Sequence, residues 1–278
     1  MRRVKIVTDS GSDIPIDIAT ELEIDVVPLT ITFGDTSYTE LTSKTFWEKA
    51  AASDVLPQTA APSTEAFANA FKKAANVGYR EILCICLSSD LSATFQNATK
   101  AAESTRSDEV SIEVFDSRSA TYGEGSLAVY GAQNADLPLG SLLDAVKDLA
   151  SRTRVFGTLN TLENLRKGGR IGSAAATLGS ILSIKPIIEI RNGVVEAHAK
   201  QRTRRRALEY IYDLVATEGD RIESISIISA QATDLDEFVA RISEITKIKE
   251  ILISAIGPVI GTHGGEGMIA VCFSTKPN

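Results

Sequence analysis

Hydroxyl and small residues crowd three short segments, Thr8–Asp13, Ser88–Thr94 and Asp116–Ser119, and each segment follows an apolar run. Apolar runs of this length are typical of strands, and ligands usually bind beyond the carboxyl ends of parallel strands. Each segment also precedes an amphipathic stretch, and the free N–H groups at the start of a helix favour an anion. Ordinary helix capping would explain any one segment. Together with Pro57–Ser63, they predict a cluster of hydroxyl groups that faces an anion.

A glycine-rich segment, Ile256–Gly267, contains His263 between two apolar stretches. Glycine lets the backbone approach a ligand closely, and an imidazole can donate to an anion and carry charge near neutral pH. A plain turn histidine is the alternative, but the segment is too rich in glycine for a simple two-residue hairpin, which favours a ligand-binding loop. The other histidine, His198, lies near the end of a predicted hairpin strand and is expected to be structural or on the surface.

Two basic segments lie in the second half of the chain. Leu165–Ile171 contains Gly-Gly-Arg and precedes a stretch of small residues, Ser173–Gly179, which is predicted to be a helix, while Lys200–Arg206 has five basic residues in seven. Basic runs usually form solvated helix faces. The first 153 residues carry an acidic excess and the remainder a slight basic excess, which leaves room for an acidic partner or a phosphorylated ligand in the second half.

Several classes of protein are excluded or disfavoured. The sequence contains no phosphate-binding G-x-x-x-x-G-K-[ST], no G-x-S-x-G and no H-E-x-x-H motif. A net charge of −7 argues against a general nucleic-acid-binding protein, and three cysteines are too few for a disulfide framework. No apolar run is long enough to span a bilayer, and Met1–Ser10 has a polar turn where a signal peptide is apolar. We therefore expect a cytoplasmic protein that is not an integral membrane protein.

Short apolar runs alternate with amphipathic stretches through the first half, which predicts a doubly wound α/β domain. The second half begins with Val155–Leu159 and contains a predicted hairpin, in which Asn192-Gly193 joins two strands. An α+β pattern follows. We therefore predict two domains, residues 1–153 and 154–278: an α/β/α domain with a parallel sheet, and a second α/β domain with a mixed, largely antiparallel sheet.

Six ordered motifs resemble those of the DegV family of fatty-acid-binding proteins. They read TDSGSDIP, PQTAAPS, ICLSSDLSATFQNA, VFDSRSAT, TLENLRKGGRI and IGPVIGTHGGEG, and they cover essentially the whole chain. The resemblance implies the same two-domain fold and a long-chain fatty acid in a buried channel, with no metal or other cofactor. It also implies a non-catalytic role as the B subunit of a fatty-acid kinase, which presents the carboxylate to an ATP-dependent kinase subunit for acyl-phosphate formation.

The resemblance also assigns individual residues. Thr59 matches the threonine of the family's T-S-Q-P-S motif, Ser92 and Thr94 match its S-G-T motif, and His263 matches the histidine of its glycine loop. These residues, with the backbone of Ala60, are expected to hold the fatty-acid carboxylate. Arg170 matches the arginine of a G-G-R motif and is expected to contact the kinase or the acyl phosphate.

The sequence departs from the family pattern at the expected head-group site. Ala60 and Ala61 replace a serine and a glutamine, Ala93 replaces a glycine, and Glu266 follows the loop histidine. A missing serine hydroxyl removes a donor worth about 1.5–3 kcal/mol if it is charge-assisted. A backbone N–H group, a water or another hydroxyl must replace it, or the ligand differs. Glu266 would repel a carboxylate unless it points outward.

The position of the tail is less defined by sequence, because residues that line a channel and residues that fill a core form the same pattern. A site between the two domains is preferred, with Phe33, Phe95, Leu182, Ile188 and Ile260 as candidate neighbours. Two other readings stay open. One is a small-molecule enzyme related to the substrate-binding half of dihydroxyacetone kinase, in which His263 would hold a substrate covalently. The other is a ligand-gated regulator that binds a partner through Arg202–Arg206.

Overall fold

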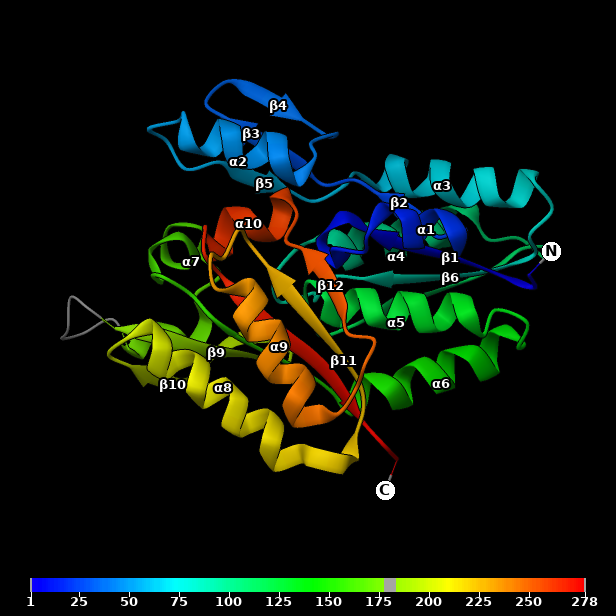
Figure 1. The fold of residues 1–278 in the computed structure, drawn as a ribbon. Helices are drawn as coiled ribbons and strands as arrows, with labels where there is room; N and C mark the ends of the chain where they lie inside the picture. The colour runs from blue at the N-terminus through cyan, green and yellow to red at the C-terminus, as the bar shows by residue number, and fades with distance from the viewer. Residues whose placement is uncertain (1, 178–183, 278) are drawn as a thin grey trace.

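The computed structural model describes residues 2–177 and 184–277, and within these residues the strands form three sheets (Figure 1). The first is a parallel sheet in the order β2-β1-β6-β7. Its strands are β1 (Val4–Asp9), β2 (Asp25–Val27), β6 (Glu81–Cys86) and β7 (Ser111–Asp116). Every residue of β1 is buried, as expected for a strand of a parallel sheet with both faces covered.

Helices cover both faces of the parallel sheet (Figure 1). Helices α3 (Thr64–Asn76) and α4 (Thr94–Thr105) lie on one face, and α1 (Ile16–Glu21), α5 (Tyr122–Gln133) and α6 (Leu139–Ser151) lie on the other. Successive residues of β6 point to opposite faces, so Cys84 packs in the core with Phe67 while Ile85 packs in the core with Leu127. This is the α/β/α arrangement that the sequence predicts.

The second sheet has the order β10-β9-β8-β13-β11-β12, and all its pairs are antiparallel except β11 with β12. Its strands are β8 (Thr153–Thr158), β9 (Lys185–Arg191), β10 (Val194–Gln201), β11 (Ile222–Ser229), β12 (Leu252–Ala255) and β13 (Ile269–Thr275). Helices α8 (Arg204–Glu218) and α9 (Leu235–Thr246) cover one face. The predicted two-domain α/β fold is confirmed, whereas the division between residues 153 and 154 stays a prediction.

The other face of the second sheet packs against the parallel-sheet unit. Val155, Ile188 and Ala270 share one core with Leu87 and Tyr122. Figure 1 shows the two sheets side by side, with α5 lying between them. The carboxyl ends of β1 and β6 therefore face the second sheet across a common apolar junction.

A third, small antiparallel sheet was not predicted. It has the order β4-β3-β5 and is formed by β3 (Thr30–Phe33), β4 (Thr36–Tyr38) and β5 (Gln58–Ala60), with α2 (Ser43–Ala51) beside it. The predicted strand Val26–Phe33 is split, because Pro28 has no N–H group to donate to a ladder and the chain leaves the parallel sheet there. Phe46 and Trp47 of α2 pack on Gly261.

The glycine-rich segment is not the loop that the sequence suggested. Pro258–Gly264 forms a short helix, α10, because proline at its first position fixes φ at a helical value. Gly265 ends it with φ of +77°. A second short helix, α7 (Glu163–Lys167), lies against α10, and three 3-10 turns, η1 (Ser10–Ser12), η2 (Gly172–Thr177) and η3 (Gly219–Arg221), complete the described elements. None of the helices described has the length and apolar character needed to cross a bilayer.

Candidate ligand-binding site

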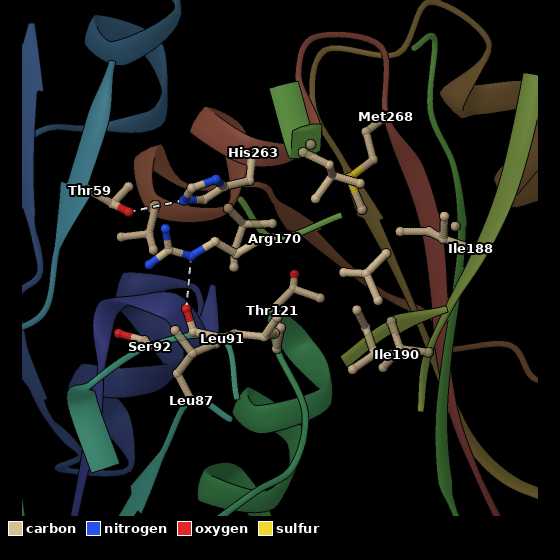
Figure 2. Close-up of a pocket in the computed structure, with 18 of the residues that line it drawn as sticks. Thr59, Leu87, Leu91, Ser92, Thr121, Arg170, Ile188, Ile190, His263 and Met268 are labelled. Atoms are coloured by element: carbon tan, nitrogen blue, oxygen red, sulfur yellow. Dashed lines mark hydrogen bonds between the residues drawn. The ribbon is translucent and has the colours of Figure 1, made fainter. Parts of the chain in front are cut away.

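An apolar pocket of about 180 Å³ lies at the junction between the parallel-sheet unit and the second sheet. Its walls come from the turn after β6, from strands β8 and β9, and from helices α7 and α10 (Figure 2). Aliphatic side chains form most of the lining, among them Leu87, Leu91, Ile188, Ile190, Ile260 and Met268. The pocket therefore suits the hydrocarbon part of a ligand.

Polar side chains gather at one end of this pocket. Thr59 Oγ1 lies 3.0 Å from His263 Nε2, within hydrogen-bond distance. Arg170 donates from Nε to the carbonyl oxygen of Leu91 at 3.0 Å and from Nη1 to that of Gly168 at 2.7 Å. Figure 2 shows these side chains and Ser92 on one side of the pocket, with Ile188 and Ile190 on the other. The pocket thus has a polar end and an apolar end.

His263 is largely buried, and burial lowers its pKa to about 4, with the positive charge of Arg170 adding to the effect. The expectation that His263 carries charge near neutral pH is therefore wrong for the ligand-free protein. Its Nδ1 atom has no hydrogen-bond partner within residues 2–177 and 184–277, and it faces Gly168, where a side chain would collide with it. The neutral imidazole can still offer one N–H group or one acceptor to a ligand.

A second hollow, of about 490 Å³, lies on the outer side of the same polar residues. Thr59, Arg170 and His263 line both the pocket and this hollow. The other residues that line the outer hollow include Lys167 and the exposed Gln58. The polar end therefore separates the apolar pocket from a second hollow that has a cationic side chain at its edge, Lys167, whose Nζ atom lies 3.4 Å from Glu163 Oε1.

The structure brings four of the sequence-predicted residues together: Thr59, Ser92, Arg170 and His263 all line the pocket. Thr94 does not line it, but it is fully buried and its Oγ1 lies 2.8 Å from Ser92 Oγ, so it orients that hydroxyl.

Ala60, the remaining predicted carboxylate contact, has an exposed side chain and does not line the pocket. Successive residues along β5 and just after it point to opposite sides, so Thr59 and the following Ala61 line the pocket while Ala60 faces away. Glu266 is exposed, and its backbone carbonyl accepts from Asn160 Nδ2 at 3.0 Å.

The candidate tail neighbours divide into three groups. Ile188 and Ile260 line the pocket. Phe33 does not line it and packs instead on Phe46, with ring centroids 5.8 Å apart, while Phe95 packs against the core between α3, α4 and the parallel sheet. Leu182 lies outside the described residues.

The three hydroxyl-rich turns do not form one cluster that faces an anion. The turn Thr8–Asp13 contains two buried acids, Asp9 and Asp13, and negative charge there would repel an anion. Ser88 donates to the backbone carbonyl of Gly193 at 2.7 Å and so joins the two halves of the chain. Of these three segments only Ser88–Thr94 contributes to the pocket lining, through Leu91, Ser92 and Ala93, and Ser92 brings the one hydroxyl group.

Sequence reasoning missed Thr121, which lines the pocket at the start of α5. Its φ of +52° is rare for a β-branched residue. The available signal was its place at the end of the VFDSRSAT motif, directly after the hydroxyl-rich turn. No sequence pattern shows that a threonine at this point adopts a left-handed φ.

The basic segment Lys200–Arg206 lies outside the pocket lining. Arg204 forms a two-point ion pair with Asp234 at 2.8 Å and donates to the carbonyl of Gly267 at 2.7 Å. Arg202 and Arg206 are exposed. His198 also lies away from the pocket, with its ring packed edge-on against Phe156.

No group of three or more His, Cys, Asp or Glu side chains is arranged to hold a metal ion in the described part of the chain. The polar end of the pocket instead offers hydroxyl groups, a neutral imidazole and a guanidinium group. Hydroxyl, imidazole and guanidinium N–H or O–H groups are donors that satisfy a carboxylate or a phosphate.

These features define a two-domain α/β protein with an apolar pocket at the domain junction and a small polar cluster at one end of it. The chain belongs to the DegV family, because the family model described as "Uncharacterised protein, DegV family" matches residues 3–276. A DegV domain-containing protein of Listeria monocytogenes is 32% identical over 282 residues, which cover 99% of this chain and 100% of that protein.

Solved structures of the family have the same fold. A DegV family protein from Thermus thermophilus, reported for its fatty-acid binding, is 28% identical with a TM-score of 0.87 and covers 99% of this chain and 100% of its own. DegV from Bacillus subtilis, described as a fatty-acid-binding protein, is 28% identical with a TM-score of 0.88 over the same shares of the two chains.

Proposed function

We propose that this protein is a cytoplasmic, non-catalytic carrier that binds a long-chain fatty acid in the junction pocket. The carboxylate lies at the polar end, beside Thr59, Ser92 and His263, and the tail extends toward Ile188 and Ile190. The observation that carries this proposal is the largely apolar pocket with a cluster of polar donors, Thr59, Ser92, Arg170 and His263, at one end. The fatty-acid binding reported for the two family members supports the choice of ligand.

The tail supplies most of the affinity on this proposal. Burying about fourteen methylene groups at ~0.8 kcal/mol each offers on the order of 11 kcal/mol before the costs of ordering the ligand. A pocket of 180 Å³ is only slightly larger than an engineered cavity of ~150 Å³ that binds benzene. A long tail therefore requires side chains of the wall to move, and Met268 is the most adaptable of them because its side chain is unbranched.

The head group needs donors rather than a strong ion pair. A buried carboxylate without partners would cost several kcal/mol, so the hydroxyls of Thr59 and Ser92 and an N–H group of His263 must satisfy it. Arg170 donates two of its five N–H groups to backbone carbonyls, and among the described residues no further acceptor is recorded for the others, which are placed to reach the ligand or a phosphate. These groups replace the donor that the family serine would supply at Ala60.

We further propose that the carrier presents the carboxylate to an ATP-dependent fatty-acid kinase subunit, which forms the acyl phosphate. The outer hollow supports this step, because it reaches Thr59, Arg170 and His263 from outside. Lys167 lines that hollow and not the apolar pocket. Its ion pair with Glu163 is solvent-exposed and therefore weak, so Lys167 is suited to contact an incoming phosphate or the kinase subunit.

A small-molecule enzyme that holds a hydroxyketone on His263 is the alternative. The pocket disfavours it, because the hydroxyl groups of such a substrate would face aliphatic side chains without hydrogen-bond partners. No structural observation favours a ligand-gated regulator over the carrier.

Native mass spectrometry followed by solvent extraction tests the carrier. The purified protein should carry a long-chain fatty acid, and the delipidated protein should bind palmitic acid. Protein that is free of lipid, does not bind palmitic acid and binds a short hydroxyketone would reject the carrier in favour of the enzyme.

A charge reversal at Lys167 tests the presentation step. Lys167→Glu should lower the rate of acyl-phosphate formation with the kinase subunit and ATP by roughly tenfold, while the Kd for palmitic acid stays within twofold. Lys72→Glu, an exposed charge reversal on α3 far from either hollow, is the matched control. Equal rates for the two variants would contradict a role for the outer hollow.

A further inference from the structure

Asp13 is a buried acid at the domain junction that the proposed site does not use directly. Its side chain is only 8% exposed. Oδ1 accepts from the backbone N–H of Gly257 at 2.9 Å, and Oδ2 accepts from Thr121 Oγ1 at 2.6 Å. The hydroxyl of Ser254 donates to the backbone carbonyl of Asp13. One residue therefore joins the turn after β1, the start of α5 and the segment between β12 and α10.

The two residues that donate to the Asp13 carboxylate, Gly257 and Thr121, both show local geometry that suits this contact. A Cβ atom at Gly257 would lie 2.8 Å from Asp13 Oδ1, so only glycine permits this close approach. Thr121 adopts φ of +52°, which is rare for a β-branched residue and is unfavourable without support from its surroundings. Asp13 itself has φ of +48°. The surroundings must hold such conformations in place, and the three hydrogen bonds of Asp13 do so.

Both partners also belong to the frame of the ligand pocket. Gly257 caps α10, the short helix that carries Val259, Ile260 and His263 into the pocket lining. Thr121 lines the pocket directly, whereas Asp13 does not. A shift of the first turn of α10 would displace His263 from Thr59, because the whole helix is only seven residues long.

No cation within residues 2–177 and 184–277 forms an ion pair with Asp13. The titratable groups that face it are Asp9 at the end of β1 and Glu124 on α5, both acidic. Burial raises the pKa of Asp13 to about 7, the hydrogen bonds from Thr121 and Gly257 oppose this, and the charge of Asp9 adds to it. Burial at the junction therefore favours the neutral acid form of Asp13 over the ionised carboxylate.

We propose that Asp13 is a positioning residue of the ligand site: it fixes the start of α10 against Thr121 and so sets where His263 stands in the pocket. The inference deepens the proposed function and rests on it for the identity of the ligand. The positioning role of Asp13 itself depends only on hydrogen bonds and packing within this chain.

Three variants separate positioning from general stability. Asp13→Ala removes both acceptors. Asp13→Asn keeps one acceptor for Gly257 and supplies a donor that Thr121 Oγ1 can accept, so it imitates the neutral acid. Glu124→Gln is the matched control, because Glu124 is equally buried in the same acid cluster but contacts Thr8 rather than α10.

Calorimetric titration of delipidated protein with palmitic acid at pH 7 gives the first readout. Asp13→Ala should raise Kd by roughly tenfold or more, whereas Asp13→Asn should stay within threefold and Glu124→Gln within twofold of the wild-type value. A folded Asp13→Ala variant with the wild-type Kd overturns the proposal, and so does an equal loss in Glu124→Gln.

A second readout needs no ligand. Trp47 is the single tryptophan and packs on Gly261 of α10, so its emission reports the position of that helix. Asp13→Ala should shift the emission of the ligand-free protein, while Glu124→Gln should not. If wild-type protein fails to bind palmitic acid, the proposed function fails, and the Trp47 comparison still judges the positioning role.

The pH profile decides the case even if Asp13→Ala does not fold. Wild-type affinity for palmitic acid should decline between pH 6 and 8.5, because Asp13 loses its proton there and the ionised form is harder to keep buried. Asp13→Asn cannot ionise and should show a flatter profile, while the ionisation of the ligand is common to both. Parallel profiles would overturn the proposal.

Discussion

Replacement of His263 tests the head-group assignment most directly. On the proposed function, its imidazole donates to the ligand carboxylate from a largely buried position beside Thr59. A hydrogen bond to a charged group contributes about 1.5–3 kcal/mol. His263→Ala should therefore weaken the binding of palmitic acid by roughly 10- to 150-fold. His263→Gln, which keeps an amide N–H group, should recover part of that loss.

The assay compares two ligands that share a tail. Hexadecanol lacks the carboxylate, so His263→Ala should change its Kd much less than that of palmitic acid, as measured by competition with a fluorescent fatty acid. If both ligands lose affinity equally, the histidine acts by shaping the pocket and not by binding the head group. If neither loses affinity, the carboxylate lies elsewhere and the assignment of the polar end is refuted.

Two further changes test the frame around the pocket. Ile190 lines both the apolar pocket and a neighbouring polar hollow beside Arg154. Ile190→Ala should therefore open the tail end of the pocket and raise the affinity for longer fatty acids relative to palmitic acid. Calorimetry over a series of chain lengths measures this, and an unchanged order of affinities would contradict it. The pKa of Asp13 is raised from 3.8 to about 7 in the folded protein, so its contribution to stability is present at low pH and is lost as pH rises to 7. Asp13→Asn should thus have the higher Tm at pH 8 and a shallower fall in Tm between pH 5 and 8, and equal slopes in thermal unfolding would refute the assignment.

Periodicity and turn residues predicted the parallel sheet and its helices, because a strand with both faces covered leaves an uninterrupted apolar run. Cys84 and Ile85 illustrate this, since they are neighbours in sequence that enter two different cores. The small third sheet escaped prediction because Pro28 interrupts an otherwise continuous apolar stretch. The helix α10 escaped because glycine weighs against a helix, although Pro258 marks its first residue.

The polar end of the site was predicted from motifs, but its electrostatics were not. The residue types at Thr59, Ser92 and His263 are visible in the sequence, whereas the burial that keeps His263 neutral depends on packing between distant segments. The acidic turn Thr8–Asp13 shows the same limit. Its hydroxyl residues suggested an anion site, but the fold turns Asp9 and Asp13 inward, and the turn joins the domains instead.

The proposed function places two opposed demands on the head-group site. The carrier must hold a carboxylate in a buried position, yet that carboxylate must remain a good enough nucleophile to accept a phosphoryl group. A close, fully engaged cation would meet the first demand and oppose the second, because it stabilises the charge that must attack. A neutral His263 with the hydroxyls of Thr59 and Ser92 meets both, since each group donates without carrying a charge. Arg170 lies close enough to act, but backbone carbonyls of Leu91 and Gly168 hold part of its guanidinium group, which suits it to stabilise the acyl phosphate after transfer.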